Sequence, residues 1–316
     1  MATTRLKNLA RRGEPWALGI VLGYASAEML DRLAVMHADV DPIVGPFLRG
    51  VPSLVLGVIL VWKNRTLGQL RPQSSKYIGK RAVLSLIVAG VLSTLGLFAY
   101  YFAMRWGGLV VTVPVLQTYA IWGTLIAWFF LGERIHALAL GGVGLLGLGL
   151  GLLAWGQFRG QPVSPQWYWA IPLALFTALT YGISGVMWRD AQLRGAHQST
   201  AILLQFVASE FVALVIPAVM GKTGLILSTA GRNLIALLGS GVLSGIIAVY
   251  CYFMALRLMA VARVYAFASL SPLIAVLFAR IFLHEHLSGL IISGVLLVSI
   301  GITLTQVFRP KDEKQA

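Results

Sequence analysis

The chain has 316 residues, of which 58% are apolar and only 11% charged, and its mean hydropathy is +0.82. This composition excludes an ordinary water-soluble domain and predicts a protein that spans a membrane. A net charge of +14 would suggest nucleic-acid binding in a soluble protein, but here the bases lie between apolar segments, as the positive-inside rule predicts. Nucleic acid is therefore excluded as a partner, and the single cysteine, Cys251, rules out an intrachain disulfide and a multi-cysteine metal site.

The apolar segments follow one another along almost the whole chain. Windows of about 19 residues divide them at charges and at proline and glycine clusters. Each segment approaches the ~20 residues that a helix needs to cross a bilayer, whereas a barrel strand needs only about 10. We therefore predict an all-α integral membrane protein with ten transmembrane helices, at 16–36, 45–62, 82–104, 109–131, 137–156, 167–188, 199–220, 233–256, 260–282 and 287–307.

The distribution of lysine and arginine sets the expected orientation. Most of the bases fall in the tail 1–15, the tail 309–316 and the loops 63–81 and 189–198, whereas "HADVDP" at 37–42 has two aspartates and no base. Basic loops stay in the cytoplasm, so we expect a multi-pass inner-membrane protein with both termini inside. A cleaved signal peptide ending near "ASA" at 25–27 is the alternative interpretation of the first span.

Two halves of the chain repeat one pattern. Tyr100 and Tyr252, Arg105 and Arg257, and Glu133 and Glu285 form pairs separated by the same 152 residues. This offset predicts two units of five spans each, at 16–156 and 167–308, joined by a linker at 157–166. Because five is an odd number, the units have opposite orientations, as in the inverted-topology repeats of many secondary transporters.

Several motifs resemble the EamA-type transporters of the drug/metabolite transporter superfamily. They are the paired "LGER" (131–134) and "LHEH" (283–286), the "SLSPLIAVLFA" of 269–279, and the glycine-rich fifth and tenth spans. The resemblance implies a ten-helix carrier of amino acids, other small metabolites or drugs, usually an exporter. It also implies a central cavity lined largely by spans three, four, eight and nine. One departure is that the second half has Pro272 where the first has Ala120, with its own proline earlier at Pro114.

Charged residues inside the predicted spans are candidates for coupling to protons or cations, because charge in the bilayer is costly unless a cavity or partner accepts it. Glu210 lies in the middle of span seven, and Glu28 and Asp31 lie in span one with Arg32. Glu28 and Arg32 are four residues apart, so a neutralising ion pair within the helix is the structural alternative. Glu210 has no base at that spacing.

Polar and aromatic residues of spans four, eight and nine are the candidate substrate site. Gln117 and Ser269 occupy equivalent repeat positions, and Tyr265, Ser269 and Pro272 share one helical face. The alternative for each is an interhelical hydrogen bond, and for each aromatic it is packing. The predicted substrate-binding residues are Gln117, Tyr119, Trp122, Tyr252, Tyr265 and Ser269.

Other motifs are interpreted as structural. We expect Glu133 and Glu285 to stabilise the N-terminus of the helix that follows each, and the glycines of 141–151, including Gly147 and Gly151, to allow close helix approach. The "HEH" of 284–286 supplies too few ligands for a metal site, and no cofactor is expected.

These features together predict a secondary transporter that exports a small organic metabolite such as an amino acid by alternating access, with protons as one candidate energy source. A proton-coupled exporter of cationic drugs is the alternative. An intramembrane enzyme that uses the buried carboxylates is the alternative from another class. The expected partners are the small-molecule substrate and the lipid bilayer, with the protein a monomer or a homodimer.

Overall fold

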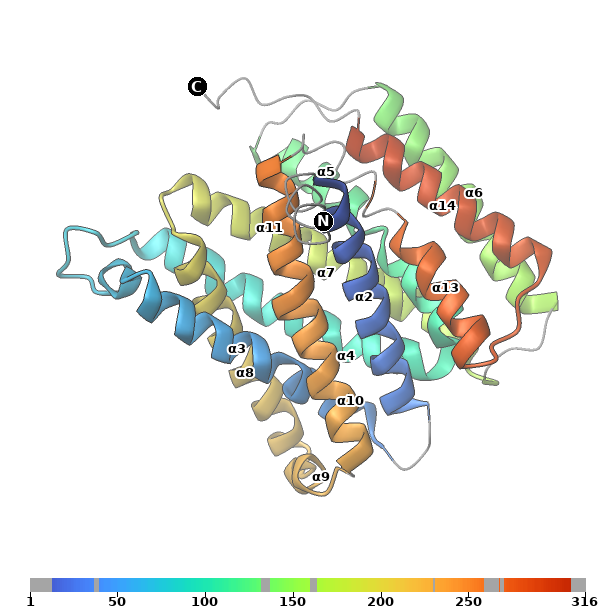
Figure 1. Cartoon of the computed structure of the whole chain (residues 1–316), viewed down its shortest axis with the longest axis horizontal. Helices are drawn as coiled ribbons and strands as arrows, with labels where there is room; N and C mark the ends of the chain where they lie inside the picture. The colour runs from blue at the N-terminus through green and yellow to red at the C-terminus, as the bar shows by residue number, and fades with distance from the viewer. Residues whose placement is uncertain are drawn as a thin grey trace, which may run out of the picture.

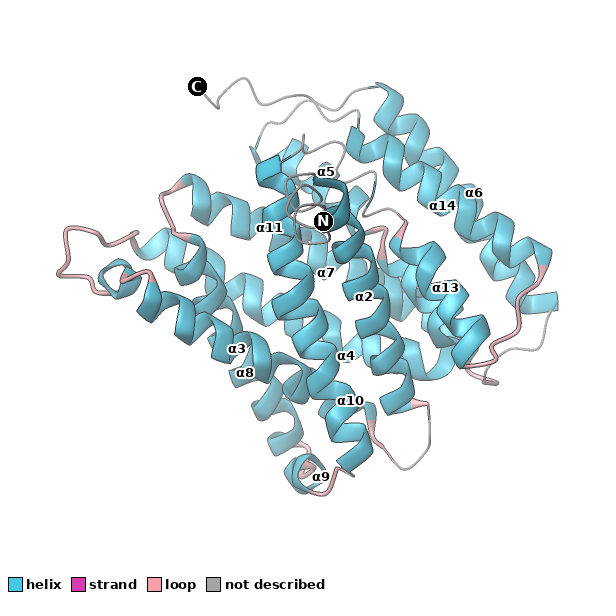
Figure 2. Cartoon of the chain, in the orientation of Figure 1, coloured by secondary structure: helices cyan, strands magenta, loops and turns pink. Residues whose placement is uncertain are grey.

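A computed structural model describes residues 13–36, 40–131, 137–159, 164–229, 231–258, 267 and 270–307, and this part of the chain contains helices and no strand (Figure 2). The first half forms α2 (Gly13–Val35), α3 (Gly45–Lys63), α4 (Lys80–Leu116), α5 (Tyr119–Leu131) and α6 (Ala137–Arg159). The second half forms α7 (Trp167–Leu193), α8 (Gln198–Val219), α9 (Thr223–Leu227), α10 (Gly231–Gly241), α11 (Val249–Leu258), α13 (Ser271–Phe282) and α14 (Gly289–Val307), and a π-helical segment, Val242–Ala248, joins α10 to α11.

Five helical stretches in the described residues are long and apolar enough to cross a membrane: Pro42–Lys63, Lys80–Gly123, Trp167–Leu193, Gln198–Val219 and Gly231–Cys251. Three further apolar helices are shorter: Gly141–Gly156, Ser271–Phe282 and Gly289–Leu304. The prediction of an all-helical membrane protein is confirmed. Most of the ninth predicted span before residue 270 lies outside the described residues.

The boundary predicted between the third and fourth spans coincides with a kink. α4 runs from Lys80 to Leu116, but Gly108 inside it is non-helical, with φ of 68° and ψ of −174°, and divides α4 into two helices. Glycine adopts this backbone conformation readily because it has no Cβ. The second of these helices ends at Leu116, two residues after Pro114, and α5 begins at Tyr119. The predicted span 109–131 is therefore two shorter helical pieces.

The two halves begin a helix at equivalent places although their prolines differ. α5 begins at Tyr119 and α13 at Ser271, which are 152 residues apart, the offset of the sequence repeat. Pro272 occupies the first turn of α13, where a missing N–H costs no hydrogen bond, whereas Pro114 lies inside α4 before its end. The start of this helix is thus a shared feature of both repeats.

Helices of one repeat pack against their counterparts in the other, as Figure 1 shows for the pairs α6 with α14 and α3 with α8. Across the two halves, α4 also packs on α7, and α10 and α11 pack on α2. At the α6 and α14 interface, an added Cβ on Gly149 would lie 2.7 Å from the carbonyl oxygen of Gly294, and one on Gly301 would lie 2.7 Å from that of Gly142. These two contacts are related by the same offset of 152, so a pseudo-twofold relation extends to individual residues.

Close approach was predicted for the glycines of 141–151, and Gly142 and Gly149 of this stretch provide it, but the pair singled out, Gly147 and Gly151, does not. Gly147 and Gly151 face open space on α6, where an added Cβ would meet nothing within 4 Å. The contact is made instead by the opposite side of the helix, at Gly149 and Gly156. Gly149, two positions after Gly147, faces the other way because a helix turns about 100° per residue.

Contacts between loops group the helix ends into two sides of the bundle. On one side, the side-chain hydroxyls of Thr66 and Ser199 lie 2.8 Å apart, and Gln69 accepts a hydrogen bond from the backbone N–H of His197. On the other side, Lys222 pairs with Asp41 at 2.7 Å. Partial burial opposes ionisation of Asp41, but hydrogen bonds from Lys222 and the Ile43 backbone outweigh it and hold the Asp41 pKa below its ordinary value.

Candidate functional site

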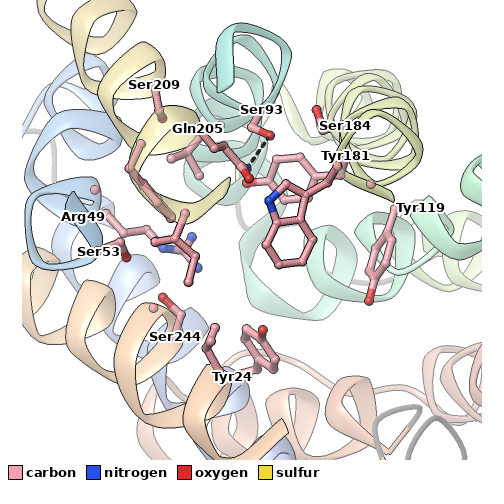
Figure 3. Close-up of a pocket in the computed structure, with 18 residues that line it drawn as sticks. Tyr24, Arg49, Ser53, Ser93, Tyr119, Tyr181, Ser184, Gln205, Ser209 and Ser244 are labelled. Carbon is pink, nitrogen blue, oxygen red and sulfur yellow. Dashed lines mark hydrogen bonds between the residues drawn. The ribbon is translucent and has the colours of Figure 1, made fainter. Parts of the chain in front are cut away.

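A cavity of about 390 Å³ lies between the two halves of the chain. The first half contributes α2, α3, α4 and α5, and the second contributes α7, α8 and the segment that joins α10 to α11. Figure 3 shows side chains from these helices facing one another across the space. The lining residues with polar or aromatic side chains are Tyr24, Arg49, Ser53, Ser93, Tyr119, Tyr181, Ser184, Trp188, Gln205, Phe206, Ser209 and Ser244.

Of the six predicted substrate-binding residues, the structure places Tyr119 in this cavity, with its ring 42% exposed. Gln117 is half-buried at the break after α4 and does not line the cavity. Trp122 packs its backbone and Cβ against Gly182 of α7. Neither residue lines this cavity, since α5 turns toward α7 after the break, and their role in substrate binding stays a prediction. The side chain of Tyr252, and Tyr265 and Ser269 altogether, lie outside the described residues.

Several cavity hydroxyls are held by neighbouring helices. Ser184 donates to the backbone carbonyl of Ala89, and Ser209 lies 2.6 Å from the Thr94 hydroxyl. Gln205 donates from its side-chain amide to Ser93 at 3.4 Å, the dashed line in Figure 3. These contacts join α4 to α7 and α8, so the polar part of the cavity wall is braced between the two repeats.

Arg49 is the residue that sequence reasoning missed. It lies in the first turns of α3, pairs with Asp31 of α2 at 2.8 Å, and has a side chain 17% exposed. Its guanidinium carbon lies 5.5 Å from the centre of the Tyr100 ring, within the range of a cation–π contact. An arginine inside an apolar span with no acid on its own helix should have been noticed from the sequence, because such a charge needs a partner or a cavity.

Asp31 is completely buried and fully partnered. Besides Arg49, it accepts hydrogen bonds from the Tyr101 hydroxyl at 2.7 Å and the Tyr100 hydroxyl at 3.2 Å. Both tyrosines are buried in α4. Since its oxygens are occupied, Asp31 holds Arg49 in place, and the structure gives no direct support to its predicted coupling role.

The predicted ion pair between Glu28 and Arg32 is wrong. Arg32 donates from Nε to Glu285 at 3.0 Å and from Nη1 to the Met104 carbonyl at 2.9 Å. Its position at the end of α2 brings Arg32 to the α4 kink, where it meets the Glu285 carboxylate and the backbone carbonyl of Met104. Glu28 is 5% exposed, and its Oε2 has no hydrogen-bond partner among the described residues.

Glu285 stabilises a helix N-terminus, but a different one from that predicted. Its carboxylate accepts hydrogen bonds from the Leu109 and Val110 backbone N–H groups, just past the Gly108 kink, at 3.1 Å each. The predicted partner was the following helix, α14, which begins only at Gly289. The kink frees these N–H groups, so the carboxylate caps the second part of α4. Glu133, its repeat counterpart, lies outside the described residues.

Glu210 lies behind the cavity wall between α8 and α3. It is 4% exposed, and neither carboxyl oxygen has a hydrogen-bond partner in the described part of the chain. Its Oε1 lies directly against Gly50, where no Cβ would fit. Gly50 and Ser209, its immediate neighbours, both line the cavity, so Glu210 is separated from the space by one layer of atoms.

The sequence model of the EamA-like transporter family matches residues 11–155 and again residues 168–307. The chain belongs to the EamA-like transporter family. Its two matches are the two repeats that surround the cavity, and the family consists of membrane transporters. A solved crystal structure of another protein aligns with a TM-score of 0.60 and 14% identity over 91% of this chain and 97% of that one, which shows the shared fold. Among curated proteins, none matches this sequence.

Proposed function

We propose that the protein is a ten-span secondary transporter of this EamA-like family that moves a small organic metabolite outward through the central cavity. The observation that carries the proposal is a cavity enclosed by helices of both repeats, at the interface where inverted-repeat transporters place their substrate. The pseudo-twofold packing of α6 with α14 and of α3 with α8 supports opposite orientations of the two units.

The position of the cavity along the helices suggests which side it serves. Trp188 lies five residues before the end of α7, about 7.5 Å along the axis, whereas Arg49 lies 14 residues before the end of α3, about 21 Å. Both helix ends are on the side of the 63–81 and 189–198 loops, which we expect in the cytoplasm. The pairs Arg32 with Glu285 and Asp41 with Lys222 close the opposite side. This arrangement is that of a carrier awaiting substrate from the cytoplasm.

The other functions fit the cavity less well. An enzyme with acid–base carboxylates would direct them toward its substrate, but Glu28, Asp31 and Glu210 lie behind the lining residues. An exporter of cationic drugs would gain from an acidic wall, and among the described residues that line the cavity the charged one is Arg49. The proposal is tested by counterflow in proteoliposomes, screened over amino acids, aromatic metabolites and organic cations.

The inverted topology makes a prediction about the loops. In a Cys251→Ala background, cysteines at Lys76 and Gln192 should react with a membrane-impermeant thiol reagent only from the cytoplasmic side, and one at Lys222 only from outside. Lys76 and Lys222 both lie beyond the long apolar stretches. Reaction of positions 76 and 222 from the same side would refute the arrangement.

A further inference from the structure

Arg49 dominates the charge that faces the cavity. Among the described lining residues it is the charged one, while serines, tyrosines, Gln205 and apolar side chains complete the wall. Of the acids in the neighbouring helices, Asp31 is paired with Arg49 and Glu210 lies against Gly50, and neither they nor Glu28 are among the lining residues. A bound molecule would therefore meet a cation and no carboxylate.

The guanidinium has donors to spare. Asp31 engages Nη1 at 2.8 Å and has no exposed side-chain surface, whereas 17% of the Arg49 side chain is exposed. A guanidinium carries several N–H donors in a rigid planar fork, and one ion pair occupies only part of it. Figure 3 shows Arg49 reaching from α3 toward the middle of the cavity. The unoccupied edge is thus directed at the space and held in place by Asp31 and the Tyr100 ring.

The rest of the wall favours an apolar body. Tyr24, Tyr119, Tyr181, Trp188 and Phe206 contribute rings from α2, α5, α7 and α8. A volume of about 390 Å³ lies near the lower end of the ~300–1,000 Å³ typical of small-molecule sites. Rings around a single polar anchor are the arrangement by which such sites orient a compact amphipathic ligand.

We propose that Arg49 binds the carboxylate of the transported molecule, so that the substrates are small carboxylic acids with an apolar or aromatic body. The fork geometry of arginine matches a carboxylate, which it can bind through two parallel hydrogen bonds. An amine on the substrate is not required, because no acid lines the described cavity wall. That the bound acid is also transported rests on the proposed function, whereas its binding to Arg49 is measured separately.

The test compares four probes that share a phenyl ring: 3-phenylpropanoate, L-phenylalanine, 2-phenylethylamine and 3-phenylpropanol. Calorimetric titration of the purified wild-type protein should detect the first two and not the last two. Because Arg49→Gln alone leaves the buried Asp31 charge without an ionic partner, the informative variant is the double substitution Arg49→Gln with Asp31→Asn, which removes both charges. It should melt near the wild-type temperature and bind the two carboxylates about tenfold or more weakly. Lys76→Gln, in an exposed loop, is the control and should bind as the wild type does.

Three results would overturn the inference: no binding of either carboxylate by the wild type, equal binding of the amine, or unchanged carboxylate affinity in the folded double variant. Carboxylate binding that depends on Arg49, without counterflow of the bound compound in proteoliposomes, would refute the proposed function and leave the binding site standing. Counterflow of a compound at the same rate by the wild type and the double variant would support the proposed function and refute the binding site at Arg49.

Discussion

Replacement of Glu285 by alanine should be among the most destabilising single substitutions in this protein. It removes the ionic partner of Arg32, which is buried, and the acceptor for the Leu109 and Val110 N–H groups at the α4 kink. Loss of one member of a buried ion pair typically costs about 3–5 kcal/mol because the other charge stays behind uncompensated. The melting temperature of the purified protein in detergent should fall clearly, and the yield of folded protein with it.

The matched control is Asp190→Ala, which breaks the pair with Arg194 at the end of α7. That pair has a similar distance of 3.0 Å, but its side chains are 38% and 26% exposed, and exposed pairs contribute only about 0–1 kcal/mol. An equal change in melting temperature for the two variants would contradict the structural role given to Glu285. Partial recovery in the double substitution of Arg32→Gln with Glu285→Gln would confirm that the two charges act together.

The second large effect concerns coupling, which we propose to reside in Glu28, Glu210 or both. Each is nearly buried and has at least one carboxyl oxygen without a hydrogen-bond partner in the described residues, and neither is among the residues that line the cavity. A partnerless ionised carboxylate away from water is costly, so uptake and release of a proton is the chemistry such a group offers. Glu28→Gln and Glu210→Gln keep the side-chain shape and remove titration.

At least one of these two variants should lose accumulation driven by a pH gradient while retaining counterflow, since exchange of substrate for substrate needs no net proton movement. Glu14→Gln is the control, because Glu14 is exposed in the first turn of α2. Uphill transport with wild-type pH dependence in both Glu28→Gln and Glu210→Gln would show that these carboxyl groups are structural.

Hydropathy was sufficient to predict an all-helical membrane protein, and the repeat offset was sufficient to predict its two related halves. The apolar segments must form helices to satisfy their backbone in lipid, and the offset of 152 also relates the starts of α5 and α13, and of α6 and α14. The choice of ion-pair partner was beyond the sequence. Spacing within one helix suggested Glu28 for Arg32, but the actual partner is 253 residues away and is brought near by the kink at Gly108.

The lining of the cavity was harder to read from the sequence. Tyr119 begins the helix after the break and lines the cavity, whereas the turn of α5 toward α7 keeps Trp122 out of it. The aromatic wall comes partly from α7 and α8, whose ring residues look like ordinary membrane packing in a sequence. Arg49 alone carried a visible sign, a charge inside an apolar span.

The most direct test of transport through this cavity is counterflow by two phenylalanine variants. Gly185 lines the cavity and Gly147 faces outward on α6, and at both an added Cβ would meet nothing within 4 Å. Both lie inside helices, so Gly185→Phe and Gly147→Phe change helix propensity alike, and only the former fills the cavity. Proteoliposomes that contain the wild type or Gly147→Phe, loaded with the best substrate of the screen, should take up labelled substrate. Proteoliposomes that contain folded Gly185→Phe should take up no more of it than protein-free liposomes do. Undiminished counterflow by Gly185→Phe would contradict the account.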